Sequence, residues 1–178
     1  MHVVRWDQSP EFLGGIRVVQ GTLDGRDEGT KAADVVGVRD RDIWVFEIKD
    51  FRNRLDEWEK RSKELPLEIA LKVRDTLAGV IGSHHQRDAE PWSRAVASRL
   101  VATTPLTVVA VIARPARWRN VPPGKRKVQN DVLMKRTRQL LAWVSRRVLV
   151  IDPMLAEELV HLPDVAVASL AQSKPAQK

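Results

Sequence analysis

The chain has 178 residues, of which 43% are hydrophobic and 30% are charged. This composition is typical of a folded globular protein, so we expect a single domain over residues 1–170 and a loose tail over 171–178. The absence of cysteine excludes disulfides, thiolate catalysis and zinc sites built on sulfur. Thirty Lys and Arg residues outnumber 23 Asp and Glu residues, and the net charge of +7 favours a polyanionic partner.

No apolar run in the sequence is long enough to cross a bilayer. The first residues, MHVVRWDQSP, lack the basic start and the apolar stretch of a signal peptide. We therefore expect a cytoplasmic protein with no membrane partner.

IRVV at 16–19 favours a short strand near the start of the chain. The first clear pattern follows at residues 31–51, KAADVVGVRDRDIWVFEIKDF, where two alternating apolar runs flank a polar tetrapeptide. This pattern predicts a β-hairpin with Asp40 and Arg41 at its two-residue tip. The predicted pairs are Arg39 with Asp42, Val38 with Ile43, Val36 with Val45 and Asp34 with Glu47.

Helices and further strands alternate along the rest of the chain. Apolar residues recur three and four positions apart in the helical segments, and continuous apolar runs mark the strands. In chain order, the pattern predicts helices at 66–82 and 91–101, a strand at 104–113, a helix at about 125–147, a strand at 147–152, a brief helix at 152–162 and a strand at 164–170. Such alternation is typical of α/β proteins, so we expect a mixed β-sheet with helices on both faces.

Asp34, Glu47 and Lys49 project from one face of the predicted hairpin, at one end of its strands. In this register the Cβ atoms of the two acids lie roughly 5 Å apart, and carboxylates that close repel each other unless a cation sits between them. Mg²⁺ prefers oxygen ligands, so Asp34, Glu47 and the backbone carbonyl of Ile48 are candidate ligands for Mg²⁺ or Mn²⁺. Lys49 would stand beside the bound water and steady the charge of a phosphoryl transition state. The simpler alternative is that Lys49 only pairs with Glu47 or Asp34.

Residues Ala33 and Asp34, the hairpin, and the triplet EIK at 47–49 resemble the PD-(D/E)xK nuclease superfamily, whose members share the restriction-endonuclease-like fold. By the order of its elements, the likeness spans about residues 28–152. It implies a restriction-endonuclease-like core, with Asp34 and Glu47 as metal ligands and Lys49 as the catalytic lysine. Ala33 stands where the motif has proline.

The same resemblance implies two further site residues. The superfamily usually has a helix before the first strand, often with another acid. Residues 1–30 show no clear long helix, and Glu11 and Glu28 are the candidates for this acid, with an ordinary surface carboxylate as the alternative for each. The helix after the catalytic strand often lends a polar group, which makes Lys72 a secondary candidate. Glu68, Lys72 and Asp75 also form a polar stripe opposite the apolar one, which favours an ordinary surface pair between Glu68 and Lys72.

A basic segment, ARPARWRNVPPGKRK at residues 113–127, follows the predicted strand at 104–113. Basic side chains around an exposed indole suit phosphate contact and base stacking. The candidate nucleic-acid contacts in this segment are Arg114, Arg117, Trp118, Arg119, Lys125, Arg126 and Lys127. A solvated loop with Trp118 folded back on the core explains the segment equally well. The adjacent His84 and His85 fall where a helix is expected to end, which favours capping over a second metal site.

These patterns favour a Mg²⁺-dependent nuclease that hydrolyses phosphodiester bonds of DNA, or less readily of RNA, with a metal-activated water. The alternative is a catalytically silent PD-(D/E)xK-like module that binds nucleic acid or protein in a repair or defence assembly. A basic structural protein without a polyanionic partner is a third possibility. Whether the protein forms a homodimer or joins a partner subunit stays open.

Overall fold

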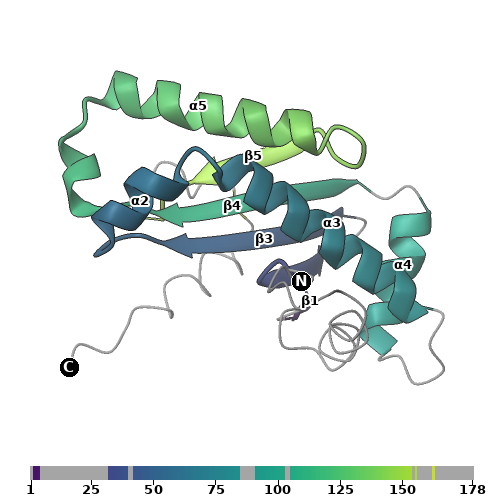
Figure 1. Ribbon diagram of the computed structural model, residues 1–178. Helices are drawn as coiled ribbons and strands as arrows, with labels where there is room; N and C mark the ends of the chain where they lie inside the picture. The colour runs from purple at the N-terminus through teal and green to yellow at the C-terminus, as the bar shows by residue number, and fades with distance from the viewer. Residues whose placement is uncertain are drawn as a thin grey trace, which may run out of the picture.

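A five-stranded mixed sheet runs through the described part of the protein (Figure 1). The computed structural model describes residues 2–4, 32–39, 42–84, 91–102, 105–153, 155 and 162. The strands are β1 His2–Val4, β2 Val35–Arg39, β3 Asp42–Asp50, β4 Leu106–Ala113 and β5 Arg147–Ile151, and they lie side by side in this order. The pairs β1–β2 and β2–β3 are antiparallel, whereas β3–β4 and β4–β5 are parallel. The predicted α/β class with a mixed sheet is confirmed.

The hairpin of β2 and β3 has the register that the sequence predicts. Val36 pairs with Val45, Val38 with Ile43 and Arg39 with Asp42. A slip of one residue would turn the buried Val36 and Val45 away from the core, which is why alternation specifies the register so well. Strand β1, which was not predicted, pairs with the outer edge of β2.

Helices follow β3 and flank β4. Within the described residues, they are α2 Leu55–Arg61, α3 Leu65–His84, α4 Pro91–Val101, the short 3₁₀ helix η2 Ala116–Asn120 and α5 Pro123–Leu140. The bounds of α4 are those predicted, and α3 extends the predicted helix at 66–82 slightly at both ends. Helices α2 and η2 were not predicted. None of the described helices combines the length and the apolar character needed to span a lipid bilayer.

Helix α5 ends at Leu140, so the predicted helix at 125–147 was too long. The Ser145 hydroxyl donates a hydrogen bond of 2.6 Å to the carbonyl of Leu106 and accepts one of 3.0 Å from the N–H of Arg147. These bonds tie the chain to the start of β4, and Arg147 therefore begins β5. The apolar spacing continues past residue 140 and carries no sign of this long-range contact.

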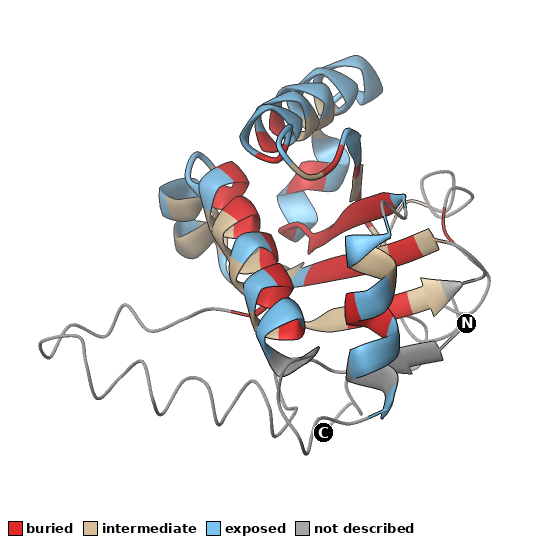
Figure 2. Cartoon of the chain, turned by 90° about the vertical axis from the view of Figure 1, so that its right-hand side faces the viewer, coloured by how far each residue is buried: buried red, intermediate tan, exposed pale blue. Residues whose placement is uncertain are grey.

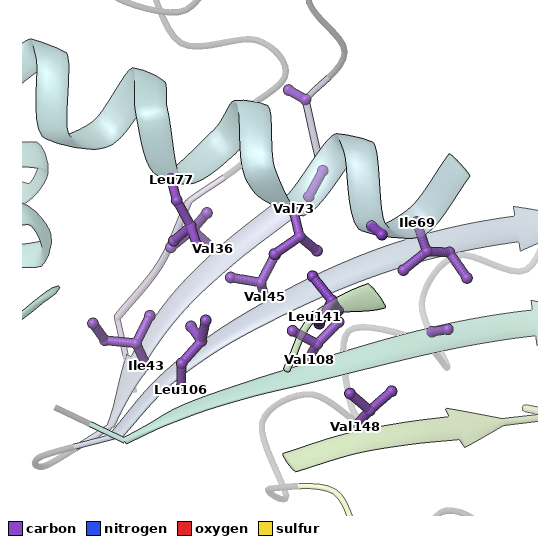
Figure 3. Close-up of a cluster of buried hydrophobic side chains, with 14 of the residues drawn as sticks. Val36, Ile43, Val45, Ile69, Val73, Leu77, Leu106, Val108, Leu141 and Val148 are labelled. Atoms are coloured by element: carbon purple, nitrogen blue, oxygen red, sulfur yellow. The ribbon is translucent and has the colours of Figure 1, made fainter. Parts of the chain in front are cut away.

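The main core lies between one face of the sheet and helices α3, α4 and α5 (Figure 2). Ile69, Val73 and Leu77 of α3 form one stripe, because residues four apart share a face of a helix. Leu77 lies over Val36 and Val73 over Val45 of the hairpin, and Ile69 belongs to the same core further along the helix (Figure 3). Asp34, Glu47 and Lys49 belong to this same face by the alternation of the strands.

The other face of the sheet carries a smaller apolar cluster of Phe46, Val109, Val111, Ile151 and Leu162. No described helix contributes to that cluster, so the expectation of helices on both faces is not met within the described residues. The predicted strands at 16–19 and 164–170 and the tail at 171–178 lie outside the described residues, as does most of the predicted helix at 152–162.

Candidate active site

Asp34 and Glu47 lie near each other at the open end of the hairpin, where Lys72 Nζ is 3.9 Å from Asp34 Oδ1 and 2.7 Å from Glu47 Oε1. The pairing of β2 with β3 ends at Val35 and Phe46, so the predicted pair of Asp34 with Glu47 is not among the strand pairs of the described residues. Asp34 lies one residue before β2, and its Oδ2 accepts a hydrogen bond of 2.6 Å from the N–H of Ile48. The N–H and C=O groups of one strand residue point to the same side, so the Ile48 carbonyl also faces this edge. Ala33, directly before Asp34 in the chain, donates its N–H to Thr76 Oγ1 of α3 instead of to β3. The hairpin therefore opens where the two acids lie.

Glu47 is fully buried in the middle of this site. Its Oε1 lies 2.7 Å from Lys72 Nζ and 3.0 Å from Lys49 Nζ. Its Oε2 is buried and has no hydrogen-bond partner within the described residues. Burial raises the pKa of Glu47, repulsion from Asp34 raises it further, and the two lysines offset only part of this effect. Within the described residues, the two lysines therefore do not fully offset the burial and repulsion that disfavour the charged form of Glu47.

Lys49 is held between two carboxylates. Its Nζ lies 3.0 Å from Glu47 Oε1 and donates a hydrogen bond of 2.5 Å to Glu68 Oε1 of α3. Burial works to lower the pKa of Lys49, but its attraction to Glu47 and its bond to Glu68 outweigh burial and raise it. Glu68 in turn accepts a bond of 2.8 Å from Arg61 at the end of α2. Lys49 therefore remains an ammonium group with a fixed position.

The prediction of a surface ion pair between Glu68 and Lys72 is wrong, because each side chain has other partners. Lys72 Nζ lies 2.7 Å from Glu47 Oε1 and 3.9 Å from Asp34 Oδ1, while Glu68 reaches Lys49 and Arg61. Helix α3 crosses the face of the sheet, so both side chains flank the buried stripe and point to the strand ends. Their positions directly before the buried Ile69 and Val73 were the signal for this placement.

The oxygen atoms of the site fit a hard divalent cation in their chemistry. Asp34, Glu47 Oε2, which has no hydrogen-bond partner in the described part of the chain, and the Ile48 carbonyl are ligands of the type that Mg²⁺ accepts. Within the described residues there is no group of three or more Asp, Glu or His side chains placed for a metal, so the remaining ligands would be water and substrate oxygens. The candidate Glu28 lies outside the described residues, as does Glu11.

Of the two positions that the sequence left open for Trp118, the structure has the one folded back on the core, so its predicted role as an exposed contact to nucleic acid is corrected. Trp118 is only 7% exposed and packs edge-to-face on Trp58 of α2, with ring centroids 5.8 Å apart. Arg114 is also buried: its guanidinium lies 4.5 Å from the centroid of Trp118 and 5.6 Å from that of Trp58. It pairs with Asp152 at 3.6 Å and donates to Asn130. These contacts leave Trp118 and Arg114 unsuited to contact nucleic acid from an open surface.

The other predicted nucleic-acid contacts differ in exposure. Arg126 is half-buried, and the remaining four are exposed: Arg117, Arg119, Lys125 and Lys127. Arg117 pairs with the exposed Glu59 of α2. The tertiary contacts of this segment were hidden from the sequence because Trp58, Asn130 and Asp152 are distant in the chain.

No protein-family model matches the chain, and no curated protein or solved structure is significantly similar to it. The resemblance to the PD-(D/E)xK superfamily therefore remains a prediction. It depends on Asp34, the EIK triplet, and the order of strands and helices around them.

Proposed function

We propose that this protein is a Mg²⁺-dependent nuclease of the PD-(D/E)xK type that hydrolyses phosphodiester bonds, with DNA as its first substrate to test. One observation carries the proposal: Glu47 is a buried carboxylate whose Oε2 lacks a hydrogen-bond partner within the described residues, beside Asp34 and Lys49. A purely structural ion pair does not require a partnerless buried oxygen, because such an atom costs stability.

In this proposal each site residue has a separate role. Asp34, Glu47 and the Ile48 carbonyl would hold Mg²⁺ or Mn²⁺, which supplies an activated water and neutralises phosphate charge. Lys49 carries its positive charge at a fixed position between Glu47 and Glu68, where it would stabilise the negative charge that develops on the scissile phosphate. Glu68 and Arg61 act behind it as positioning residues.

Cleavage of plasmid and linear DNA in Mg²⁺ or Mn²⁺ tests the proposal directly. Asp34→Asn and Glu47→Gln each remove one ligand charge with little change in shape, and each should reduce cleavage by at least about a thousandfold. Asp50→Asn is a matched control, because Asp50 lies on the same strand, faces the opposite side of the sheet and pairs with Arg52. Its activity should stay within about twofold of wild type. Wild-type activity in Glu47→Gln would overturn the assignment.

The silent binding module is the second candidate, and one observation favours it. The side-chain nitrogen of Lys72 lies near both Glu47 and Asp34. Lys72 therefore already supplies part of the positive charge that a metal ion would bring to these two carboxylates. Calorimetric titration with Mn²⁺ separates the two candidates. A nuclease should bind Mn²⁺ at a site that Asp34→Ala removes, whereas the silent module should show no such site.

A further inference from the structure

A pocket of about 520 Å³ lies beyond the carboxyl ends of β3 and β4. It is bordered by α2, by the start of α3, by η2 and by one side of α5, and α2 lies at that end of the sheet in Figure 1. Crevices at the carboxyl ends of parallel strands are the usual ligand sites of open α/β sheets. The volume is in the range of sites that hold a small organic molecule or one nucleotide.

The lining of the pocket is basic. Lys63, Arg114, Arg117 and Arg136 contribute to it, and none of the described residues that line it is acidic. Arg114 and Arg117 have carboxylate partners outside the lining, Asp152 and Glu59 respectively. Lys63 and Arg136 are exposed at the pocket and form no ion pair within the described residues. The pocket therefore offers positive charge to an anionic ligand.

The remaining lining is largely apolar and includes two indoles. Trp58 and Trp118 form a wall that the Arg114 guanidinium holds in place from one side. The Trp118 side chain lines the pocket although it is only 7% exposed, so it contributes apolar wall rather than a polar contact. Val121 and Val132 add apolar surface. An apolar wall with cations around it suits a planar base joined to a phosphate.

The pocket adjoins the candidate active site through a short chain of contacts. Ser62 and Pro66 line the pocket, and the intervening loop connects α2 to α3. Arg61, directly before Ser62, binds Glu68, and Glu68 binds Lys49. Arg61 and Glu68 therefore connect the wall of the pocket to Lys49, and a nucleic-acid strand bound at Lys49 would extend toward the pocket.

We propose that this pocket holds one unpaired nucleotide of the substrate, so that the protein acts on single-stranded nucleic acid or on strands with unpaired ends. A base inside a duplex is stacked and paired, and it reaches a concave pocket only after it leaves the stack. The inference depends on the proposed nuclease function for its meaning, but binding in the absence of metal tests it separately from cleavage.

Val132→Trp is the main test variant, because Val132 lines the pocket and is 47% exposed, so a larger side chain fills the pocket without entering the core. Val128→Trp is its matched control, since Val128 is one turn earlier on α5, 60% exposed and outside the lining. Binding of fluorescent oligothymidine and of a blunt duplex of equal length is measured by anisotropy in EDTA. Wild type should prefer oligothymidine, and only Val132→Trp should weaken that binding, by about tenfold.

Arg136→Ala provides a second variant that does not depend on steric blocking. The slope of log affinity for oligothymidine against log salt should fall by about 0.7 if Arg136 contacts one phosphate. Arg138→Ala, an exposed arginine of α5 outside the lining, should change the slope less. Thermal melts check that all four variants fold.

Equal effects of Val132→Trp and Val128→Trp on oligothymidine binding would overturn the pocket proposal, as would tighter binding of the blunt duplex by wild type. Neither result would contradict the proposed cleavage at Glu47 and Lys49, which is tested separately. Selective loss in Val132→Trp, combined with no cleavage in any metal, would support the pocket and defeat the nuclease.

Discussion

Two buried charged residues, Arg114 and Glu47, lie near the carboxyl ends of neighbouring strands, and they differ in how far their surroundings compensate the charge. Arg114, directly after β4, pairs with Asp152, donates to Asn130 and lies against the rings of Trp58 and Trp118. Its partners are all within the fold. Breaking such a pair leaves a charge buried without compensation, which is costly. Arg114 therefore has a sufficient structural role.

Glu47 of β3 is buried as deeply, but its environment disfavours its charge. Its pKa is raised by burial and by repulsion from Asp34, in spite of Lys49 and Lys72. The difference teaches that burial of a charge is not itself a sign of function. A buried charge indicates a functional site when the fold leaves part of it uncompensated.

The largest expected effect is on catalysis at the Glu47 site. Lys49→Met removes the ammonium group and keeps a side chain of similar length, so cleavage should fall by about 100- to 1000-fold because a charge-stabilising donor is lost. Mn²⁺ binding, measured by calorimetry, should be retained. Lys60→Met is the control, because Lys60 is exposed on α2. Full activity of Lys49→Met would remove Lys49 from the mechanism.

The next effect is on stability at the Arg114 site. Arg114→Met leaves Asp152 buried without this partner, and the free energy of unfolding in urea should fall by about 3 kcal/mol. Arg117→Met should lower it by less than about 1 kcal/mol, because Arg117 and Glu59 form an exposed pair. Equal free energies of unfolding for the two variants would show that the buried Arg114–Asp152 pair contributes no more to stability than the exposed Arg117–Glu59 pair.

Lys72→Met tests how far the charge of Glu47 is already compensated at the proposed metal site. Lys72 Nζ lies 2.7 Å from Glu47 Oε1, so its charge should compete with a divalent cation. Without that charge, Mn²⁺ should bind about tenfold more tightly in calorimetric titration. Weaker binding would instead mean that Lys72 positions Glu47 for the metal.

The smallest expected effects are on the pH dependence of stability, and they have opposite signs at Glu47 and Glu68. The raised pKa of Glu47 means that the folded state favours its protonated form. Ionised Glu47 therefore lowers the free energy of unfolding, and this loss grows as pH rises from 4.5 through the raised value. Burial disfavours the charge of Glu68, but bonds from Lys49 and Arg61 outweigh it and lower its pKa. Its stabilisation is complete above pH 4.5 and is lost as pH falls through the lowered value.

Melting temperatures of metal-free variants across this range test both signs. Glu47→Gln should melt higher than wild type at neutral pH, and the gain should shrink in acid. Glu68→Gln should melt lower than wild type at neutral pH and approach it in acid. A Glu47→Gln protein that is less stable than wild type at pH 7 would show that the lysines fully compensate the carboxylate.

The local parts of the fold were predictable from the sequence. The register of β2 and β3 follows from alternation and a two-residue tip, and helix α4 follows from its apolar spacing. These features depend on residues that are near each other in the chain. For the same reason, the convergence of Asp34 and Glu47 was predictable.

The contacts that distinguish the two buried charges were not predictable, because they join distant segments. Glu68 and Lys72 looked like a surface pair, and Trp118 offered equal grounds for an exposed and a buried position. Only the crossing of α3 over the strand ends brings Glu68 to Lys49. Only the packing of α2 against η2 buries Trp118 on Trp58.

By itself, then, the sequence determined the hairpin, its register and the face that carries the acids, since alternation along two adjacent strands encodes all three. Tertiary structure decided which cations reach those acids, which basic residues are buried and where a pocket forms. Those outcomes depend on how helices pack across the sheet, and the pattern of apolar residues along each helix specifies its buried side but not its neighbours.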